Sequence, residues 1–240
     1  LIRKIRPTHL LHLAWYAEPG KYWTSVENFH WVQASLHLFE AFVLAGGERI
    51  VSAGSCAEYD WSYNHYSEQD TPLNPSTLYG TCKHALQMML ASYARLEDFS
   101  SAWGRVFSIY GPHEDPRRLV ASVIIRLLND QDVKCEKGDL VRDYLHVADV
   151  ASAFVSLLQS DIVGPVNIGS GDGMSLREIV EKIESTIGRF GHLIVEENKT
   201  NNGYPPILIA DNNCLYQTGW SPKYDIDSGL ADSIDWYKKQ

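Results

Sequence analysis

Tyr79 and Lys83 could carry out proton transfer together, because they lie four residues apart in the segment LYGTCK (78–83). The surrounding pattern predicts a helix over about residues 77–94, and residues four apart share one face of a helix. At a separation of about 4 Å and an effective dielectric of about 20, the lysine charge would stabilise a phenolate by roughly 4 kcal/mol, enough to lower a tyrosine pKa from about 10 toward about 7. Such a tyrosine exchanges protons near neutral pH. The alternative interpretation is an ordinary pair on a helix surface, and the motif alone does not decide.

Ser55 is a third polar group suited to the same chemistry. It ends a predicted strand in the segment VSAGSCAEY (51–59) and precedes Tyr79 by 24 positions. A serine at a strand end can hydrogen-bond both a substrate oxygen and the tyrosine hydroxyl. A hydrolase is not indicated, because the segment lacks the second glycine of a G-x-S-x-G nucleophile elbow and Cys56 has no evident histidine partner.

The first half of the chain alternates strands and helices that could position these groups. Strands are predicted over residues 8–14, 49–53 and 102–109. Between the first two, apolar residues recur at steps of three and four, which predicts a helix that covers a sheet: Phe29, Val32, Leu36, Phe39 and Val43. Such alternation indicates a mostly parallel sheet with helices on both faces, and these sheets bind ligands at the carboxyl ends of their strands.

The second half is less regular and predicts a smaller α/β lobe. We expect a helix over residues 119–128, a strand and helix within 140–158, and a strand over 165–169. Ser175 and Glu178 form a capping-box pattern that opens another helix, residues 198–206 are loop-like, and a last helix begins near Asp227. We assign residues 1–112 and 140–169 to a cofactor-binding domain, and residues 113–139 and 170–240 to a substrate-binding lobe.

Composition narrows the possible functions. The 240 residues are 45% hydrophobic and carry a net charge of −9, with no basic patch, so nucleic acid is not expected as a partner. The longest apolar stretches, such as residues 119–128, are too short for a membrane helix, so no membrane is expected either. The four cysteines are far apart with no C-x-x-C pair, which favours reduced thiols and a cytoplasmic protein. No metal is expected, because His9 and His12 point to opposite faces of a strand and no carboxylate cluster accompanies them.

Several ordered motifs carry a family resemblance. A strand-end Ser followed by Y-x-x-x-K is joined by RVFSIYGP (105–112), VRDYLHVADVA (141–151), NIGSG (167–171) and LREI (176–179). Together they resemble the extended short-chain dehydrogenase/reductase superfamily, in its nucleotide-sugar epimerase/dehydratase/reductase branch. The resemblance runs from PTHLLHLA (7–14) nearly to the end of the chain. It implies a Rossmann-type doubly wound fold and NAD or NADP as cofactor.

The resemblance also assigns catalytic and cofactor-binding roles. It makes Ser55 the hydrogen-bonding partner of the sugar oxygen and Tyr79 the acid/base. Lys83 would tune Tyr79 and bind the nicotinamide ribose. The residues implied to border the dinucleotide are Leu13, Ala14 and Trp15.

For the substrate, the resemblance places Arg142 where an arginine commonly grips the pyrophosphate of a nucleotide-sugar. The alternative for Arg142 is an ion pair with Asp143 or Asp149. Two further substrate-binding candidates occupy positions where relatives often carry Asn, namely Ser108 and Arg118, which implies altered recognition of the sugar or the nucleotide.

Departures from the family pattern bear on the reaction. Cys56 and Ala57 stand where dehydratases carry Asp-Glu, so dehydration is disfavoured. The family's G-x-x-G-x-x-G turn has no counterpart in these 240 residues, and we expect about 60 residues of a full member to be missing before Leu1. The glycine-rich segment at 169–173 is interpreted as a turn rather than a phosphate cradle.

Three functional hypotheses follow. We slightly prefer reduction of a 4-keto sugar-nucleotide over the alternative, epimerisation at C4 of a nucleotide-sugar. The hypothesis from another class is a non-catalytic Rossmann-fold binding or scaffold protein. The resemblance further implies a homodimer, built through the helices at residues 29–44 and 79–94.

Overall fold

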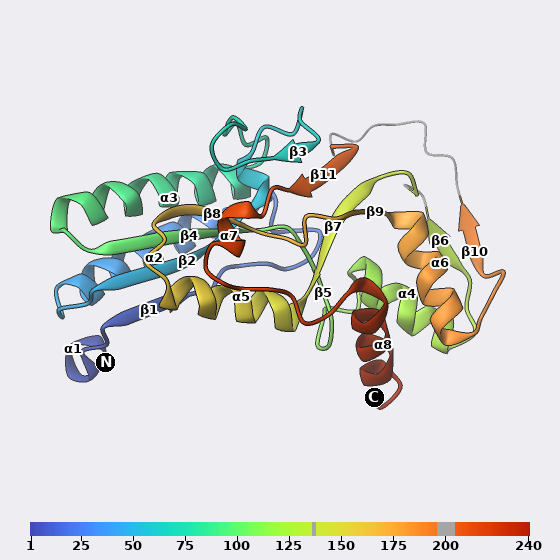
Figure 1. Ribbon diagram of the computed structural model, residues 1–240. Helices are drawn as coiled ribbons and strands as arrows, with labels where there is room; N and C mark the ends of the chain where they lie inside the picture. Colours follow the sequence, from blue (N-terminus) through green and yellow to red (C-terminus); the bar gives the residue numbers. More distant parts are fainter. Residues whose placement is uncertain (136–137, 196–204) are drawn as a thin grey trace.

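The first sheet of the computed structural model contains four parallel strands in the order β1-β2-β4-β8 (Figure 1). The structure describes residues 1–135, 138–195 and 205–240. These strands are β1 (His9–His12), β2 (Arg49–Ser55), β4 (Ser100–Val106) and β8 (Gly164–Ile168). Ser55 pairs in register with Val106, so the carboxyl ends of β2 and β4 lie at one edge of the sheet. The predicted mostly parallel, doubly wound α/β fold is confirmed.

Helices cover both faces of this sheet, since α2 (Glu27–Val43) and α3 (Leu78–Glu97) pack on one and α5 (Val147–Gln159) on the other. Successive strand residues point to opposite faces, and the core divides accordingly. Ile50 and Trp103 pack with α2 and α3, whereas their neighbours Val51 and Ala102 pack with α5. Because both faces are covered, the central strands are apolar almost throughout.

A second sheet extends beyond the carboxyl edge of the first. It contains β3 (His65–Tyr66), β11 (Ile207–Ala210), β7 (Val141–His146) and β5 (Ser108–Tyr110) as parallel neighbours, with β9 (Gly173–Ser175) antiparallel to β7. The single strand predicted over residues 102–109 is therefore wrong. The chain leaves the first sheet at Phe107, whose amide still donates to the Ile168 carbonyl at 3.0 Å, and then pairs with β7 instead.

Three helices, one from the middle of the chain and two from its C-terminal third, form a separate apolar cluster. It is built by α4 (Leu119–Leu128), α6 (Leu176–Ile187) and α8 (Ile226–Tyr237), beside the parallel pair β6 (Val133–Cys135) and β10 (Leu193–Val195). The predicted helix over residues 119–128 and the capping box of Ser175 and Glu178 are confirmed. Most of the loop predicted over residues 198–206 lies outside the described residues. The remaining short helices are α1 (Ile2–Ile5), η1 (Cys56–Glu58) and α7 (Asn213–Tyr216). The division into two domains stays a prediction.

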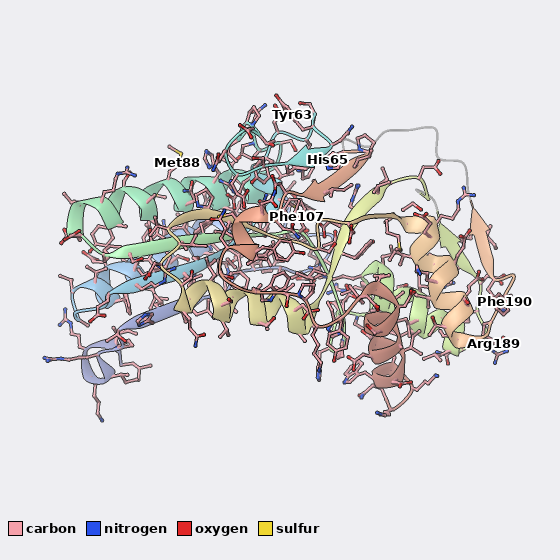
Figure 2. The ribbon with its side chains drawn as sticks, in the orientation of Figure 1. Tyr63, His65, Met88, Phe107, Arg189 and Phe190 are labelled. Carbon is pink, nitrogen blue, oxygen red and sulfur yellow. The ribbon has the colours of Figure 1, made fainter. Side chains whose placement is uncertain are left out.

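Apolar side chains remain on the outer surface of α2 and α3. Phe29 and Met88 are 52% and 56% exposed, and Figure 2 shows Met88 on the side of α3 away from the sheet. Among the helices in the described part of the chain, none has both the length and the apolar character needed to cross a membrane.

Candidate active site

Ser55 ends β2 at the carboxyl edge of the first sheet and begins the short helix η1. Its Oγ accepts a hydrogen bond from the Ala57 amide at 3.2 Å, and its own amide donates to Glu58 Oε1 at 2.8 Å. These reciprocal bonds form a capping box. Ser55 is buried, and local hydrogen bonds fix its backbone at the strand end.

Tyr79 and Lys83 reach the same edge because α3 begins beside η1. Thr77 caps the helix, with its Oγ1 accepting from the Gly80 amide at 3.0 Å. Gly80 permits a close approach, since a Cβ at this position would lie 2.2 Å from the Ala57 carbonyl oxygen. Any larger residue would push the first turn of α3 away from η1, and Tyr79 with it.

The three predicted catalytic residues are brought together at this edge. The side chains of Ser55 and Tyr79 lie close enough to interact. Lys83 Nζ donates to the Ala53 carbonyl at 2.8 Å and lies 6.0 Å from the centre of the Tyr79 ring. Strand β2 and the first turns of α3 therefore supply all three groups.

Tyr79 does not show the lowered pKa that the sequence predicts. Burial raises the pKa of Tyr79 above its ordinary value of 10, while its interaction with Ser55 opposes this shift. Burial also lowers the pKa of Lys83 to about 7, against the charge of Glu58. The expected direction for Tyr79 is thus wrong for this structure, because loss of water around the phenol outweighs the opposing effects of Ser55 and the Arg118 charge.

Trp15 covers Lys83 from the β1 side of the site. Its ring centre lies 3.8 Å from Lys83 Nζ, a cation–π distance, and its ring meets that of Tyr79 edge-on at 6.5 Å. Tyr22 and Trp23 also contact the Tyr79 ring, with centroids 4.9 and 5.6 Å away. The structure thus packs these aromatic residues around the candidate acid/base.

Asn28, at the start of α2, folds the segment that carries these rings. Its Oδ1 accepts from Trp15 Nε1 at 2.8 Å, and its Nδ2 donates to the Tyr22 and Ser25 carbonyls at 2.7 and 2.8 Å. Asn28 is fully buried. A single amide side chain therefore orients both Trp15 and Tyr22.

The other residues assigned to the dinucleotide, Leu13 and Ala14, follow β1 directly. Both are exposed, Leu13 to 50%. They precede Trp15 at the same edge of the sheet as Ser55, because β1 and β2 are parallel. Of this group, only Trp15 is in direct ring contact with Tyr79.

Two predicted substrate residues, Arg118 and Arg142, place positive charge near the site. Arg118 directly precedes α4, and its charge opposes the rise in the pKa of Tyr79. The Arg142 charge likewise opposes burial, which raises the pKa of the Cys56 thiol to about 12. Ser108 lies on β5 opposite Tyr144, and no contact links it to Ser55 or Tyr79 in the described part of the chain.

The acidic residues offered as alternative partners of Arg142 are bonded elsewhere. Asp143 accepts from the Ser170 and Gly171 amides at 2.6 and 3.0 Å. Asp149 accepts from the backbone amides of Lys223 and Tyr224. Both aspartates therefore hold loops in place.

Glu58 is a residue of this site that the sequence motifs do not single out. It is fully buried beneath Ser55 and forms an ion pair with Arg105, with 2.9 Å between Oε2 and Nε. The spacing of Ser55 and Glu58 is the same S-x-x-E pattern that identifies the cap at Ser175. The S-x-x-E pattern could therefore have identified the cap at Ser55, although it does not indicate that Glu58 is buried.

A model of the NAD dependent epimerase/dehydratase family matches residues 1–169, more than half of the chain and all of the elements that build this site. The chain belongs to this family. The match confirms the resemblance drawn from the motifs, and it places the chain among enzymes related to the extended short-chain dehydrogenases/reductases.

Individual relatives include both epimerases and dehydratases. The UDP-glucose 4-epimerase of Rhizobium leguminosarum bv. trifolii is 26% identical over the whole of this chain, which spans 80% of that protein. The dTDP-D-glucose 4,6-dehydratase of Mus musculus is 25% identical over 84% of this chain and 59% of its own length. A solved UDP-glucose 4-epimerase of Thermus thermophilus, in complex with NAD, is 25% identical and superposes with a TM-score of 0.82, covering 99% of this chain and 79% of that one.

Proposed function

We propose that this protein interconverts nucleotide-activated sugars by epimerisation at C4, using NAD. The observation that carries the proposal is the assembly of Ser55, Tyr79 and Lys83 at the carboxyl edge of a parallel sheet, where such folds bind their ligands. The relatives described above support a nucleotide-sugar as substrate.

In this proposal Tyr79 moves the proton of the sugar hydroxyl that becomes a carbonyl. Ser55, whose side chain lies beside Tyr79, donates to the same sugar oxygen and holds it in place. Both protonation states of the Lys83 amine are accessible near neutral pH, because burial lowers its pKa to about 7. The aromatic rings packed around Tyr79 exclude water from the proton transfer.

The residues of this edge fit the nicotinamide-ribose end of NAD. An ammonium group has three donors, and the Ala53 carbonyl takes one of those of Lys83, so ribose hydroxyls can take others. Leu13, Ala14 and Trp15 offer apolar surface beside it. When bound, NAD supplies the acceptor and donor of the hydride that leaves and returns to the sugar carbon.

Epimerisation is favoured over the other reactions of the family. Dehydratases of this family carry Asp-Glu directly after the strand-end hydroxyl residue, as acid and base for the elimination of water. In this chain Cys56 and Ala57 occupy those two positions. The relatives named above are epimerases and a dehydratase, which moves our preference from the 4-keto reductase to the 4-epimerase. The two hypotheses share the same catalytic groups.

The experiment is an assay of the protein as its gene encodes it, with UDP-glucose, NAD and NADH. We expect NMR to detect conversion to the C4 epimer without net change in NADH absorbance. Consumption of one NADH per sugar with a 4-keto-6-deoxy sugar nucleotide would instead establish a reductase. Absence of turnover, together with no heat on titration with NADH or NADPH, would contradict both and favour a non-catalytic binding protein.

We also propose that the protein forms a homodimer through the outer surfaces of α2 and α3. The exposed side chains of Phe29 and Met88 support this assignment, because such apolar surface is commonly covered in an oligomer. Sedimentation as a dimer is expected. A strict monomer at micromolar concentration would contradict the proposal.

A further inference from the structure

A buried ion pair lies directly beneath the candidate catalytic residues. Glu58 and Arg105 are 0% and 1% exposed, and Arg105 Nε donates to Glu58 Oε2 at 2.9 Å. Withdrawing two charges from water costs free energy that their attraction often fails to recover, so an apolar pair of similar volume is frequently as stable. We therefore expect the Glu58–Arg105 ion pair to have a role other than stabilising the fold.

The second carboxylate oxygen of Glu58 shows what that role involves. Oε1 accepts from the Ser55 amide at 2.8 Å and from Trp103 Nε1, also at 2.8 Å. One side chain thus joins the last residue of β2 to the neighbouring strand β4. The β2 residue that it holds, Ser55, is the one whose side chain lies beside Tyr79.

The surrounding backbone is shaped to admit this carboxylate. A Cβ at Gly54 would lie 2.1 Å from Trp103 Nε1 and 2.6 Å from Glu58 Oε1. Only glycine therefore leaves room for the Glu58 and Trp103 side chains to meet below the strand end. Gly54 and Ser55, the last two residues of β2, therefore both accommodate the Glu58 carboxylate.

The Arg105 guanidinium has a second hydrogen-bond partner besides Glu58. Arg105 Nη1 donates to the Tyr59 hydroxyl at 3.1 Å, and that hydroxyl donates to Asn167 Oδ1 at 2.8 Å. Asn167 Nδ2 in turn donates to the Tyr66 carbonyl at 2.7 Å. Because these hydrogen bonds connect β8 and β3, the orientation of Glu58 is determined by both sheets.

We propose that Glu58 is a positioning residue for the proposed reaction, which fixes the Ser55 main chain so that its hydroxyl meets Tyr79 and the sugar oxygen. Arg105 keeps the Glu58 carboxylate oriented toward the Ser55 amide. The inference rests on the proposed function for its catalytic consequence, while its structural part concerns the Ser55 amide alone.

The test compares two double variants of the protein as its gene encodes it, E58Q/R105M and E58L/R105M. Both lack the two charges, so any electrostatic effect on Lys83 is shared. Only the glutamine side chain of the first variant keeps a carbonyl oxygen able to accept from the Ser55 amide. E178L, which alters the remote capping box at Ser175, is the control for effects of losing a capping box away from the site.

We expect kcat of E58L/R105M to be about 10- to 100-fold below that of E58Q/R105M, because small displacements of a reacting group cost this much. KM should differ by less than about threefold, since Glu58 lies below the site rather than against the substrate. Hydrogen exchange at single-residue resolution should show faster exchange of the Ser55 amide in the leucine variant than in the glutamine variant. Thermal melting establishes that both are folded.

Equal kcat in the two folded double variants would overturn the inference, as would equal protection of the Ser55 amide. If the unmodified protein shows no turnover of nucleotide-sugars, the proposed function fails and the catalytic consequence fails with it. The exchange comparison still decides whether Glu58 fixes Ser55, so the two failures are distinguishable.

Discussion

Two turns of this molecule use the same reciprocal hydrogen bonds in opposite surroundings. Ser55 with Glu58 and Ser175 with Glu178 both form capping boxes. Glu178 is exposed, and its Oε2 accepts from the amide and the hydroxyl of Ser175 at 2.8 and 2.7 Å. Glu58 is fully buried and also binds Trp103 and Arg105.

A local motif therefore fixes a turn, whereas its environment determines what the turn can do. At Ser175 the box begins a helix and its carboxylate faces water. At Ser55 the carboxylate of the box also bonds to residues of the neighbouring strand β4. In addition, Gly80 lets α3 approach η1 closely enough to bring Tyr79 beside Ser55. Substitutions in the two boxes, and at Gly80 beside the first, test this contrast.

The largest effect is expected from removing each glutamate alone. Glu58→Leu leaves Arg105 buried without its counter-charge, so we expect the free energy of unfolding to fall by about 3–5 kcal/mol. Glu178→Leu removes only exposed hydrogen bonds and should cost about 0.5–1.5 kcal/mol. Urea unfolding of both variants measures the two values. Equal losses would show that burial of the first box has no energetic consequence.

A smaller effect is expected at Gly80, where α3 approaches η1. Gly80→Ala should raise helix propensity by about 1 kcal/mol in isolation, but the added Cβ collides with the Ala57 carbonyl. We therefore expect a net loss of about 1–3 kcal/mol together with reduced turnover. Thr81→Ala, at the exposed neighbouring position, is the matched control. A stabilised and fully active Gly80→Ala protein would mean that the close approach is unnecessary.

The smallest effect concerns pH and the exposed box. Hydrogen bonds from Ser175 lower the pKa of Glu178 below its ordinary value of 4.5. A lowered carboxyl pKa contributes stability above the unfolded value, and this contribution is lost as pH falls through the folded value. The melting temperature of wild type should exceed that of Glu178→Gln at pH 7 by a small margin. The margin should shrink as pH falls through this lowered pKa, and a margin that grows on acidification would contradict the assignment.

Sequence patterns predicted the parts of the fold that depend on local periodicity. Helix α2 and the capping box at Ser175 were confirmed because both are set by neighbours within one or two turns. Of the apolar repeat predicted to cover the sheet, Phe29 is instead exposed. The break at Phe107 was not predicted, since an apolar run reads alike whether it stays in one sheet or passes to another.

For the candidate site, spacing alone indicated that Tyr79 and Lys83 share a helix face, and motif order brought Ser55 to the same edge. The direction of the Tyr79 pKa shift was missed because it depends on burial by Tyr22 and Trp23, which are remote in sequence. The role of Glu58 was missed for a similar reason. Its partner Arg105 lies on another strand.

The central claim is that Tyr79 moves the proton in this site, and one substitution tests it directly. Tyr79→Phe keeps the ring and its aromatic contacts but removes the hydroxyl, and Tyr93→Phe makes the same change on α3 at a ring that contacts Phe99. With UDP-glucose and NAD, we expect kcat of Tyr79→Phe to fall by about 100- to 10,000-fold. Tyr93→Phe should stay within about twofold of wild type. Turnover by a folded Tyr79→Phe protein at the wild-type rate would contradict the account.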